Sequence, residues 1–436
     1  MQAELIIAHA AQLLTVAGGH GPKRGTAMAD VGIIEDGALA VRRGRIVAVG
    51  PTNEVLADFA AARVVDARGK VVLPGFVDPH THLVWAGDRA GEFEQRVAGA
   101  TYMEIMASGG GIMSTVRATR AAPLDELVAQ SRARLDRMLA HGTTTAEVKT
   151  GYGLELQAEL KMLAAIALLD AQHPVDLVPT FLGAHAVPAE YAGRADEYVD
   201  LVVDVMLPAI AQGVKGYGSG ENDLTPNPSP ITPVFCDVFC DQGAFTLEQS
   251  RRVLEAARAY GMGLKIHADE FEPLGGTRLA VELGAISADH LVCTSPEEIE
   301  LLAQSDTIGV ALPGTPFGLG HHQYTPARAF IEAGGALALA TDLNPGTCWC
   351  ESMPFIIALA CRYMHLTPAE AITAATRNAA CAVGLGEETG SLEVGKRADV
   401  IILEVDDYRH LGYRFGTNPV QTVIKRGEIV KEGSTA

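Results

Sequence analysis

The sequence predicts a (β/α)8 barrel of the TIM type that carries a small β-sandwich domain built from both chain termini. Three observations predict this fold class. Short apolar segments alternate with amphipathic segments of helical length through residues 71–385, which is typical of β/α units around a parallel sheet. Eight apolar segments occur over about 280 residues, the number and size expected of such a barrel. The flanking regions, 1–70 and 386–436, contain short strands and turns instead.

The composite β domain is predicted from the matching character of the two chain ends. Glycine and other turn residues separate short β-rich runs on both sides of the barrel, and 53–62 is the one brief helical segment before it. We expect the two halves to join into one domain of residues 1–70 plus 386–436. The predicted strands are residues 5–7, 37–41, 45–49, 63–66, 398–403, 420–424 and 427–430.

The barrel region, 71–385, is predicted to contain eight strands with helices between them. Several helices open with Pro or an acidic residue, as helix starts favour. A doubly wound open sheet is the alternative fold, but no Gly-x-Gly-x-x-Gly follows a strand. The strands are residues 71–84, 142–153, 175–187, 235–244, 263–271, 286–294, 307–316 and 337–347. The helices are residues 124–140, 155–171, 195–212, 247–260, 296–304 and 326–333, followed by 353–364 and 368–383.

Residues 212–233 interrupt this alternation with a run of Gly, Asn, Ser and Pro. Such a composition continues neither a helix nor a central strand. We expect a mobile surface insertion between the third and fourth barrel strands, and the sequence leaves open whether it is a lid or a disordered loop.

Composition and charge restrict the possible partners. With 34 Lys and Arg against 53 Asp and Glu, the 436-residue chain has a net charge of −19. Such an acidic chain is a poor candidate for binding nucleic acid or anionic membranes. We therefore expect a small-molecule substrate. An anionic substrate would need a local Arg or Lys.

The cysteine pattern and the first residues of the chain both indicate a cytoplasmic protein. Seven cysteines without a Cys-x-x-Cys pair suit reduced thiols, and we read Cys348 and Cys350 as packing residues. The first residues lack the basic region of a signal peptide, and no apolar stretch reaches the roughly 18 residues of a membrane span. We expect a soluble homodimer.

The first predicted barrel strand ends in His80-Thr81-His82. On a strand the two histidines share one face with Cα atoms roughly 6.6 Å apart, close enough to bind one ion. Neutral imidazoles suit zinc, iron or nickel rather than calcium or magnesium. The alternative is a pair of surface histidines at a strand end.

Other ionisable residues also fall at the carboxyl ends of predicted strands, where barrel enzymes hold their working groups. His80, His82, His267 and Asp342 can bind zinc or iron and leave a position for water, which points to hydrolysis. For each residue alone the alternative is a satisfied polar group at a strand end. The residues at this rim are His80, His82, His185, His267, Glu270, Asp289, His290, Asp342 and Asn344.

Three of these residues can transfer protons. Glu270 follows His267 by three positions and can protonate a substrate nitrogen. His290 can polarise a carbonyl or act as a base, and Asp342 can serve as both ligand and proton acceptor. The sequence leaves open which of His290 and Asp342 is the general base.

Four segments that carry these rim residues resemble the metal-dependent amidohydrolase superfamily. They are residues 73–82, 265–270, 288–290 and 340–342. Residues 390–399 resemble that superfamily's return into its composite β domain, and the likeness covers the chain apart from 212–233. Its two-metal members carry a carbamylated lysine on the fourth strand. Because 235–241 contains no lysine, the resemblance implies one zinc or iron ion per subunit. We read Lys149, near the end of the second strand, as a supporting or structural residue.

More closely, the segments 85–89, 147–153, 180–185 and 341–347 are similar to superfamily members of histidine degradation that hydrolyse a cyclic amide bearing a propanoate arm. Arg89 presents a planar fork suited to that carboxylate, although local pairing of Arg89 with acidic neighbours is the alternative. Tyr102 is a weaker candidate beside it. The residues that this likeness implies as substrate or product contacts are Arg89, Tyr152, His185, Glu270, Asn344, Gly346 and Thr347.

Two other functions compete with this hypothesis. A deaminase acting on a nucleobase-like ring would use the same metal and Glu270, but it would not need Arg89 for a carboxylate. A non-catalytic scaffold barrel is the second alternative, and it would have no reason to keep four metal-ligand residues at one rim.

Overall fold

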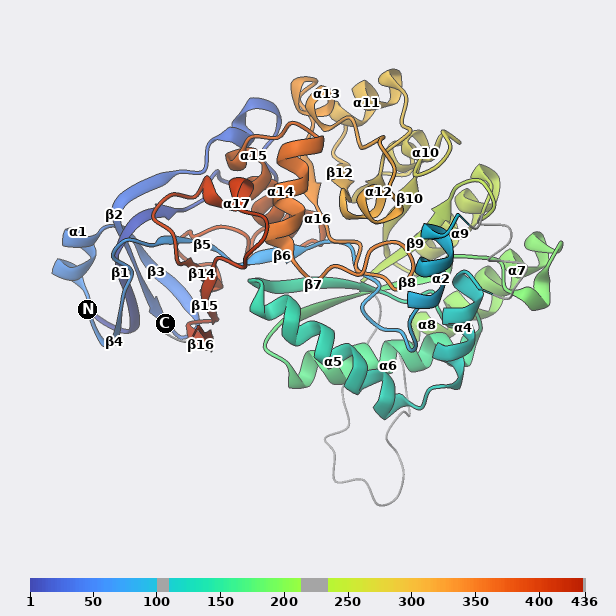
Figure 1. The fold of residues 1–436 in the computed structure, drawn as a ribbon, viewed down its shortest axis with the longest axis horizontal. Coiled ribbons are helices and arrows are strands. Elements are labelled where there is room, and N and C mark those ends of the chain that lie inside the picture. Colours follow the sequence, from blue (N-terminus) through green and yellow to red (C-terminus); the bar gives the residue numbers. More distant parts are fainter. Residues whose placement is uncertain (100–109, 213–233, 434–436) are drawn as a thin grey trace, which may run out of the picture.

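The structure is a computed structural model that describes residues 1–99, 110–212 and 234–433. It confirms the predicted fold class: eight parallel strands form a TIM-like barrel, and a separate, mostly antiparallel sheet is built from both chain ends (Figure 1). The predicted insertion beyond Gln212 and the candidate Tyr102 lie outside the described residues.

The composite sheet joins strands from the two ends of the chain. Its order is β16-β15-β14-β5-β1-β2-β3, with β4 paired to β1. Successive residues of β1 alternate between faces: Ile7 and Leu13 belong to one apolar cluster, and Ile6 and Ala8 to another. The sheet is therefore covered on both faces. Its strands are β1 (Gln2–Leu14), β2 (Ile33–Arg42), β3 (Arg45–Pro51), β4 (Ala60–Asp66), β5 (Val71–Pro74), β14 (Val400–Leu403), β15 (Val420–Lys425) and β16 (Glu428–Glu432).

The barrel strands follow one another in sequence order from β6 to β13, each parallel to the next. Each lies inside one of the eight segments predicted as strands. They are β6 (Phe76–Asp78), β7 (Thr143–Lys149), β8 (Asp176–Ala184), β9 (Phe235–Cys240), β10 (Gly263–Ala268), β11 (Ser287–His290), β12 (Ile308–Ala311) and β13 (Leu337–Leu339).

The first predicted barrel strand, residues 71–84, is in fact divided between the two sheets. Its first part, β5, pairs with β1 and β14 in the composite sheet, and β6 begins the barrel. Gly75 separates them, and a Cβ there would lie 2.4 Å from Thr144 Cγ2. Hydrophobicity is continuous across this point, so periodicity alone did not reveal the division. We propose that the two structural units meet at Gly75.

The barrel closes beyond the ends of its first and last strands. The amide of His82 donates to the carbonyl of Leu343 at 2.9 Å, and the amide of Asp342 donates to the carbonyl of His80 at 3.1 Å. The main chain that carries the candidate metal ligands therefore forms the closing seam of the barrel.

Helices surround the barrel, with α5 and α6 along one side and α10 to α13 on another (Figure 1). The predicted helix 124–140 coincides with α5, whereas 195–212 divides into α7, η3 and α8. Shorter helices such as α10 and α12 were not predicted, because each contains glycine and is only one or two turns long. The helices are η1 (Gly25–Ala29), α1 (Thr52–Asp58), α2 (Ala90–Val97), α4 (Ile112–Ala121), α5 (Leu124–Ala140), α6 (Leu156–Gln172), η2 (Ala189–Tyr191), α7 (Ala195–Leu201), η3 (Val202–Met206), α8 (Leu207–Ala211), α9 (Leu247–Ala259), α10 (Gly276–Glu282), α11 (Pro296–Ala303), α12 (Gly314–Leu319), α13 (Ala327–Glu332), α14 (Met353–Tyr363), α15 (Pro368–Thr373), η4 (Ala374–Asn378), α16 (Ala379–Ala382) and α17 (His410–Tyr413).

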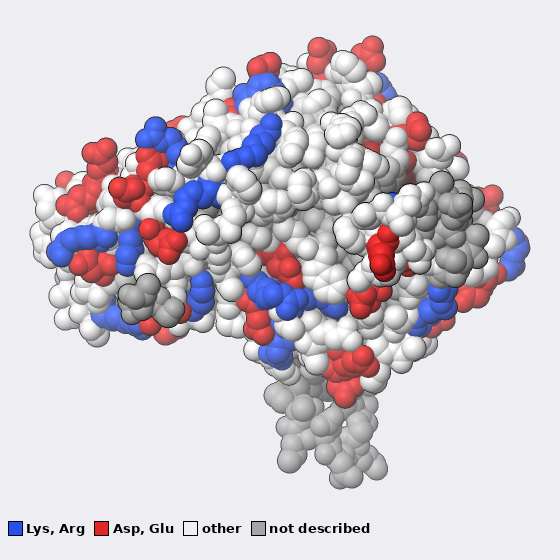
Figure 2. All heavy atoms as spheres, in the orientation of Figure 1, with Lys and Arg blue, Asp and Glu red and all other residues white. Residues whose placement is uncertain are grey.

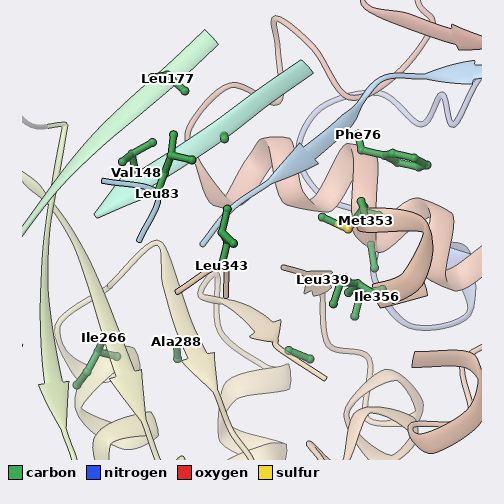
Figure 3. Packing of buried hydrophobic residues seen from close by; sticks show 14 of the residues in the cluster. Phe76, Leu83, Val148, Leu177, Ile266, Ala288, Leu339, Leu343, Met353 and Ile356 are labelled. Carbon is green, nitrogen blue, oxygen red and sulfur yellow. The ribbon is translucent and has the colours of Figure 1, made fainter. Parts of the chain in front are cut away.

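The main apolar core lies between the barrel strands and these helices. Figure 3 shows Val148, Ile266 and Ala288 on barrel strands, with Met353 and Ile356 on α14 facing Leu339. All six belong to one cluster of buried side chains, which fixes the strands whose ends carry the site.

The surface carries charges of both signs. Figure 2 shows Asp and Glu interspersed with Lys and Arg on the face in view. Within the described part of the chain, no helix combines the length and apolar character needed to cross a membrane.

Candidate active site

The four predicted metal ligands come together at the carboxyl ends of the strands. His80 and His82 follow β6, His267 lies on β10, and Asp342 follows β13. Asp342 Oδ1 is 3.5 Å from His80 Nε2 and 3.7 Å from His82 Nε2, and the His80 and His267 ring centroids are 4.5 Å apart. All four side chains are buried.

The nitrogen atoms of this cluster suit a metal ion. Nδ1 of His80 lies 2.6 Å from Asp289 Oδ2, so His80 Nε2 presents its lone pair, and neither it nor His267 Nε2 has a hydrogen-bond partner within the described chain. Burial lowers the pKa of His80 and of His82, which keeps them neutral, the form that binds metal. Three imidazoles and one carboxylate fit zinc or iron.

A second triple of potential ligands overlaps the first. The ligand atoms of His80, His82 and Asp342 lie within 4.8 Å of one another, and so do those of His80, His267 and His290. His80 is common to both triples. His290 is thus close enough to act on a substrate bound at the same centre.

Asp342 is held in a geometry that favours a proton-accepting role. The Thr315 hydroxyl donates to Asp342 Oδ2, and burial raises the pKa of Asp342 to about 6. Asp342 and His290 also have φ of 54° and 79°, in the left-handed region that non-glycine residues rarely adopt. Strain of this kind is commonly found at functional sites.

Glu270 and His290 form a second pair beside the candidate metal ligands. Glu270 Oε2 lies 3.6 Å from His290 Nε2, and both side chains are buried. Burial, and then the charge of Asp342, raise the pKa of Glu270, while burial lowers that of His290. The pair is therefore arranged to keep a proton on the carboxyl group and a neutral imidazole next to it.

Tyr152 and His185 lie against His82 on the other side of the centre. The His82 and His185 rings stack with centroids 4.9 Å apart, and the Tyr152 ring is 5.3 Å from that of His185. His185 Nδ1 is 3.0 Å from the Gly151 carbonyl, so its Nε2 is an acceptor. Burial lowers the pKa of His185 to about 3 and raises that of Tyr152, so both are neutral.

Arg89 lies at a cavity of about 340 Å³ with Gly346 and Thr347. Arg89 Nε pairs with Glu92 at 2.7 Å, the local ion pair foreseen as the alternative, but within the described chain its two Nη groups have no acidic partner. A Cβ on Gly346 would lie 2.2 Å from Arg89 Nη1, so a side chain at this position would displace the guanidinium. The free end of the guanidinium therefore faces this loop.

Asn344 shapes the loop that faces Arg89. Its Oδ1 accepts from the amides of Gly346 and Thr347, each at 2.8 Å, and its Nδ2 donates to the Asp342 carbonyl at 2.7 Å. The polar groups of Asn344, Gly346 and Thr347 that were expected to contact substrate thus bond to one another. In this arrangement they position the loop beside Asp342.

A buried ionic network below the site was not predicted. Lys149 Nζ lies 2.7 Å from Asp237 Oδ2, 3.0 Å from Glu147 Oε1 and 3.5 Å from Asp289 Oδ2. Burial opposes the charge on Lys149, but the carboxylates outweigh burial and raise its pKa. Lys265 adds a second cation, 3.0 Å from Glu147 Oε2.

This network reaches two of the candidate metal ligands. Asp289 holds His80, and Asp237 Oδ2 lies 3.0 Å from His267 Nδ1. Lys149, read from the sequence as a supporting or structural residue, connects the two carboxylates. The signal that could have found the network is the presence of charged residues inside otherwise apolar strands.

Comparisons with known proteins assign the family. The amidohydrolase family model matches residues 71–430, and a model described as an imidazolonepropionase-like composite domain of bacteria matches residues 37–62. The imidazolonepropionase of Herpetosiphon aurantiacus is 56% identical over 428 residues, which cover 97% of this chain and 98% of that protein. The chain belongs to the imidazolonepropionase family of amidohydrolases. Another member, from Chloroflexus aggregans, is 54% identical to this imidazolonepropionase-family chain, with 98% of each covered.

Solved structures of two deaminases share the fold of this family member. Escherichia coli guanine deaminase matches with a TM-score of 0.71 and 16% identity, covering 98% of each chain. A zinc-bound adenosine deaminase from Xanthomonas campestris has a TM-score of 0.67 and 21% identity, covering 99% of this chain and 93% of that one. At such identities the likeness concerns the fold alone.

Proposed function

We propose that the protein is an imidazolonepropionase, which hydrolyses 4-imidazolone-5-propanoate to N-formimidoyl-L-glutamate in histidine degradation. Water adds across the cyclic amide bond: the carbonyl carbon gains the oxygen, and the ring nitrogen leaves with a proton. The observation that carries this proposal is the 56% identity to an imidazolonepropionase over nearly the whole of both chains. The convergent His and Asp side chains and the free fork of Arg89 supply the chemistry that this reaction needs.

We propose one zinc or iron ion per chain, held by His80, His82, His267 and Asp342. Such an ion, when bound, polarises a carbonyl and lowers the pKa of water. The buried, unpartnered nitrogens described above support this ligand set. Elemental analysis of protein purified without added metal tests the number, and two equivalents, both required for activity, would contradict it.

The remaining groups have roles that follow from their protonation. Glu270 donates its proton to the leaving ring nitrogen, because burial keeps that carboxyl group protonated. Asp342, with a pKa raised to about 6, accepts the proton of the attacking water, and neutral His290 orients the carbonyl. Tyr152 and His185 bind the polar edge of the substrate ring, and Asn344, Gly346 and Thr347 form the wall of the site.

Arg89 is proposed to bind the propanoate carboxylate. Replacing it with Met removes a charge-assisted contact worth roughly 1.5–3 kcal/mol, so kcat/KM should fall about 10–150-fold. A ring analogue without the carboxylate should be a poor substrate and lose almost nothing further in Arg89→Met. The fall in kcat/KM caused by Arg89→Met and the fall caused by removing the substrate carboxylate should therefore be strongly non-additive.

Measuring both substrates on both proteins tests the assignment. Additive losses would mean that Arg89 does not contact the carboxylate. Release of ammonia from an aminopurine, with no ring opening of the imidazolone, would instead favour a deaminase.

We also propose a cytoplasmic homodimer. All seven cysteines are free thiols, which supports a reducing compartment. Tyr413 and Phe415 are 74% and 61% exposed, and neighbouring exposed aromatic side chains of this kind suit a subunit interface. Light scattering of the parent and of Tyr413→Ser/Phe415→Ser tests this association, and a monomeric parent would contradict it.

A further inference from the structure

Four arginines converge on a cavity far from the candidate active site. Arg43, Arg45, Arg397 and Arg426, with Gly44, line a space of about 240 Å³ where the composite sheet meets the start of β8. They come from three separate parts of the chain, in a protein whose net charge is −19. A cavity lined almost entirely by guanidinium groups is a site for an anion.

Two facing hairpin turns build most of this cavity. Arg42 pairs with Arg45 across Arg43-Gly44, and Lys425 pairs with Glu428 across Arg426-Gly427. Segment 395–398 runs between the turns: the Ala398 amide donates to the Gly44 carbonyl, and the Gly427 amide donates to the Ala398 carbonyl. These backbone hydrogen bonds fix the two turns relative to each other.

Both turns have an arginine at a position where another residue type would make the turn more stable. Arg43 and Arg426 have φ of 53° and 48°, and the glycines after them have φ of 72° and 83°. Two-residue turns of this kind favour Asn-Gly or Asp-Gly, because a left-handed backbone is unfavourable for a long side chain. Two matching departures at one cavity indicate that the guanidinium groups are needed there.

The carboxylates around the cavity do not neutralise it. Arg397 and Arg426 share Asp176 with Lys425, while Arg45 and Arg397 share Glu388. Asp399 pairs with Lys425 and accepts the Arg426 amide, and Glu4 accepts only the Arg43 amide. The side chain of Arg43 has no acidic partner within the described residues. The five cations named here therefore exceed the four carboxylates by one.

We propose that this arginine cavity binds a phosphate group, carried by inorganic phosphate or by a small phosphomonoester. Planar guanidinium forks match the oxygens of phosphate, and the excess of cations favours an anion. The acidic chain around the cavity disfavours a nucleic acid as the source. The site is separate from the substrate site. Strand β8 begins at Asp176, which pairs with Arg397 and Arg426 of the cavity, and it ends at Ala184, next to His185, roughly 25–30 Å away at the rise of a strand.

Titration calorimetry of the metal-loaded protein with inorganic phosphate and with glycerol phosphate tests the proposal. Arg43→Asn and Arg426→Asn should each weaken phosphate binding roughly tenfold or more. Both variants create the preferred Asn-Gly turn, so their melting temperatures should equal or exceed that of the parent. Loss of binding therefore cannot be attributed to unfolding.

Two control variants test whether phosphate binds at this cavity rather than at other arginines. Arg409→Asn alters an exposed arginine paired with Asp407 outside the cavity, and it should leave phosphate binding unchanged. Arg89→Met should also leave it unchanged, which excludes phosphate bound by Arg89. Tighter binding of glycerol phosphate than of phosphate identifies an ester ligand, and the reverse identifies the free ion. No heat of binding with either probe at about 10 mM, roughly tenfold above a Kd of 1 mM, would overturn the proposal. Equal binding by the parent and both cavity variants would also overturn it.

Discussion

Removing the carboxylate of Asp289 should weaken metal binding without removing a ligand. Asp289 is fully buried and lies 2.6 Å from His80 Nδ1, so it fixes the ring and makes Nε2 more basic. Loss of such an outer carboxylate typically lowers metal affinity 10–100-fold, about 1.4–2.7 kcal/mol. We expect this loss in Asp289→Ala, and a smaller one in Asp289→Asn, whose amide oxygen can still accept from Nδ1. Competition between the apo-protein and a fluorescent chelator for zinc measures it.

A matched control separates this effect from general instability. Asp399 is also buried and also holds a lysine, Lys425, at 2.7 Å, but it lies in the composite sheet. Asp399→Ala should lower the free energy of unfolding by an amount similar to Asp289→Ala, because each leaves a buried cation short of a partner. Only Asp289→Ala should change the zinc affinity. Equal zinc affinity in both variants and the parent would refute the reasoning.

Three further changes test other parts of the structure. Glu270→Gln should keep the metal yet lower kcat roughly 10²–10⁴-fold, the range for a general acid, and turnover near that of the parent would contradict its role. Gly346→Ala should raise KM more than it lowers kcat, because the new Cβ would lie 2.2 Å from Arg89 Nη1 and displace it; an unchanged KM in steady-state kinetics would count against that contact. Burial alone would raise the pKa of Asp176, but Lys425 and two arginines outweigh burial and lower it. The stabilisation by Asp176 is therefore present above its unfolded pKa of about 3.9 and is lost as the pH falls further, and urea unfolding of Asp176→Asn should lack that part of the acid slope.

Sequence periodicity was sufficient to predict the barrel, because its strands are short, apolar and separated by amphipathic helices. Position at strand ends was sufficient to predict that the candidate metal ligands lie close together, since parallel strands bring their carboxyl ends to one rim. The division of residues 71–84 between two sheets was not predictable in this way, because apolar residues continue from β5 into β6 and the two strands differ mainly in their pairing partners.

The buried network was missed for a different physical reason. A charged residue on a strand is normally read as solvent-exposed, and only the three-dimensional arrangement shows Lys149, Asp237 and Asp289 compensating one another inside the barrel. The role of Asn344 was similarly out of reach, because its bonds to Gly346 and Thr347 depend on the conformation of the loop rather than on residue type.

Because the candidate metal ligands lie where the first and last barrel strands meet, metal binding should stabilise the closure of the barrel. The amides of His82 and Asp342 complete the ring of strands while their side chains point to the metal centre. An ion held by His82 and Asp342 would link the first strand of the barrel to the last. Its removal should therefore loosen the barrel locally and leave the composite sheet intact. Hydrogen exchange should report this as faster exchange at His82 and Asp342 in the apo-protein, with unchanged protection along β1 and β2. Uniform acceleration throughout both sheets would mean that the ion stabilises the molecule as a whole.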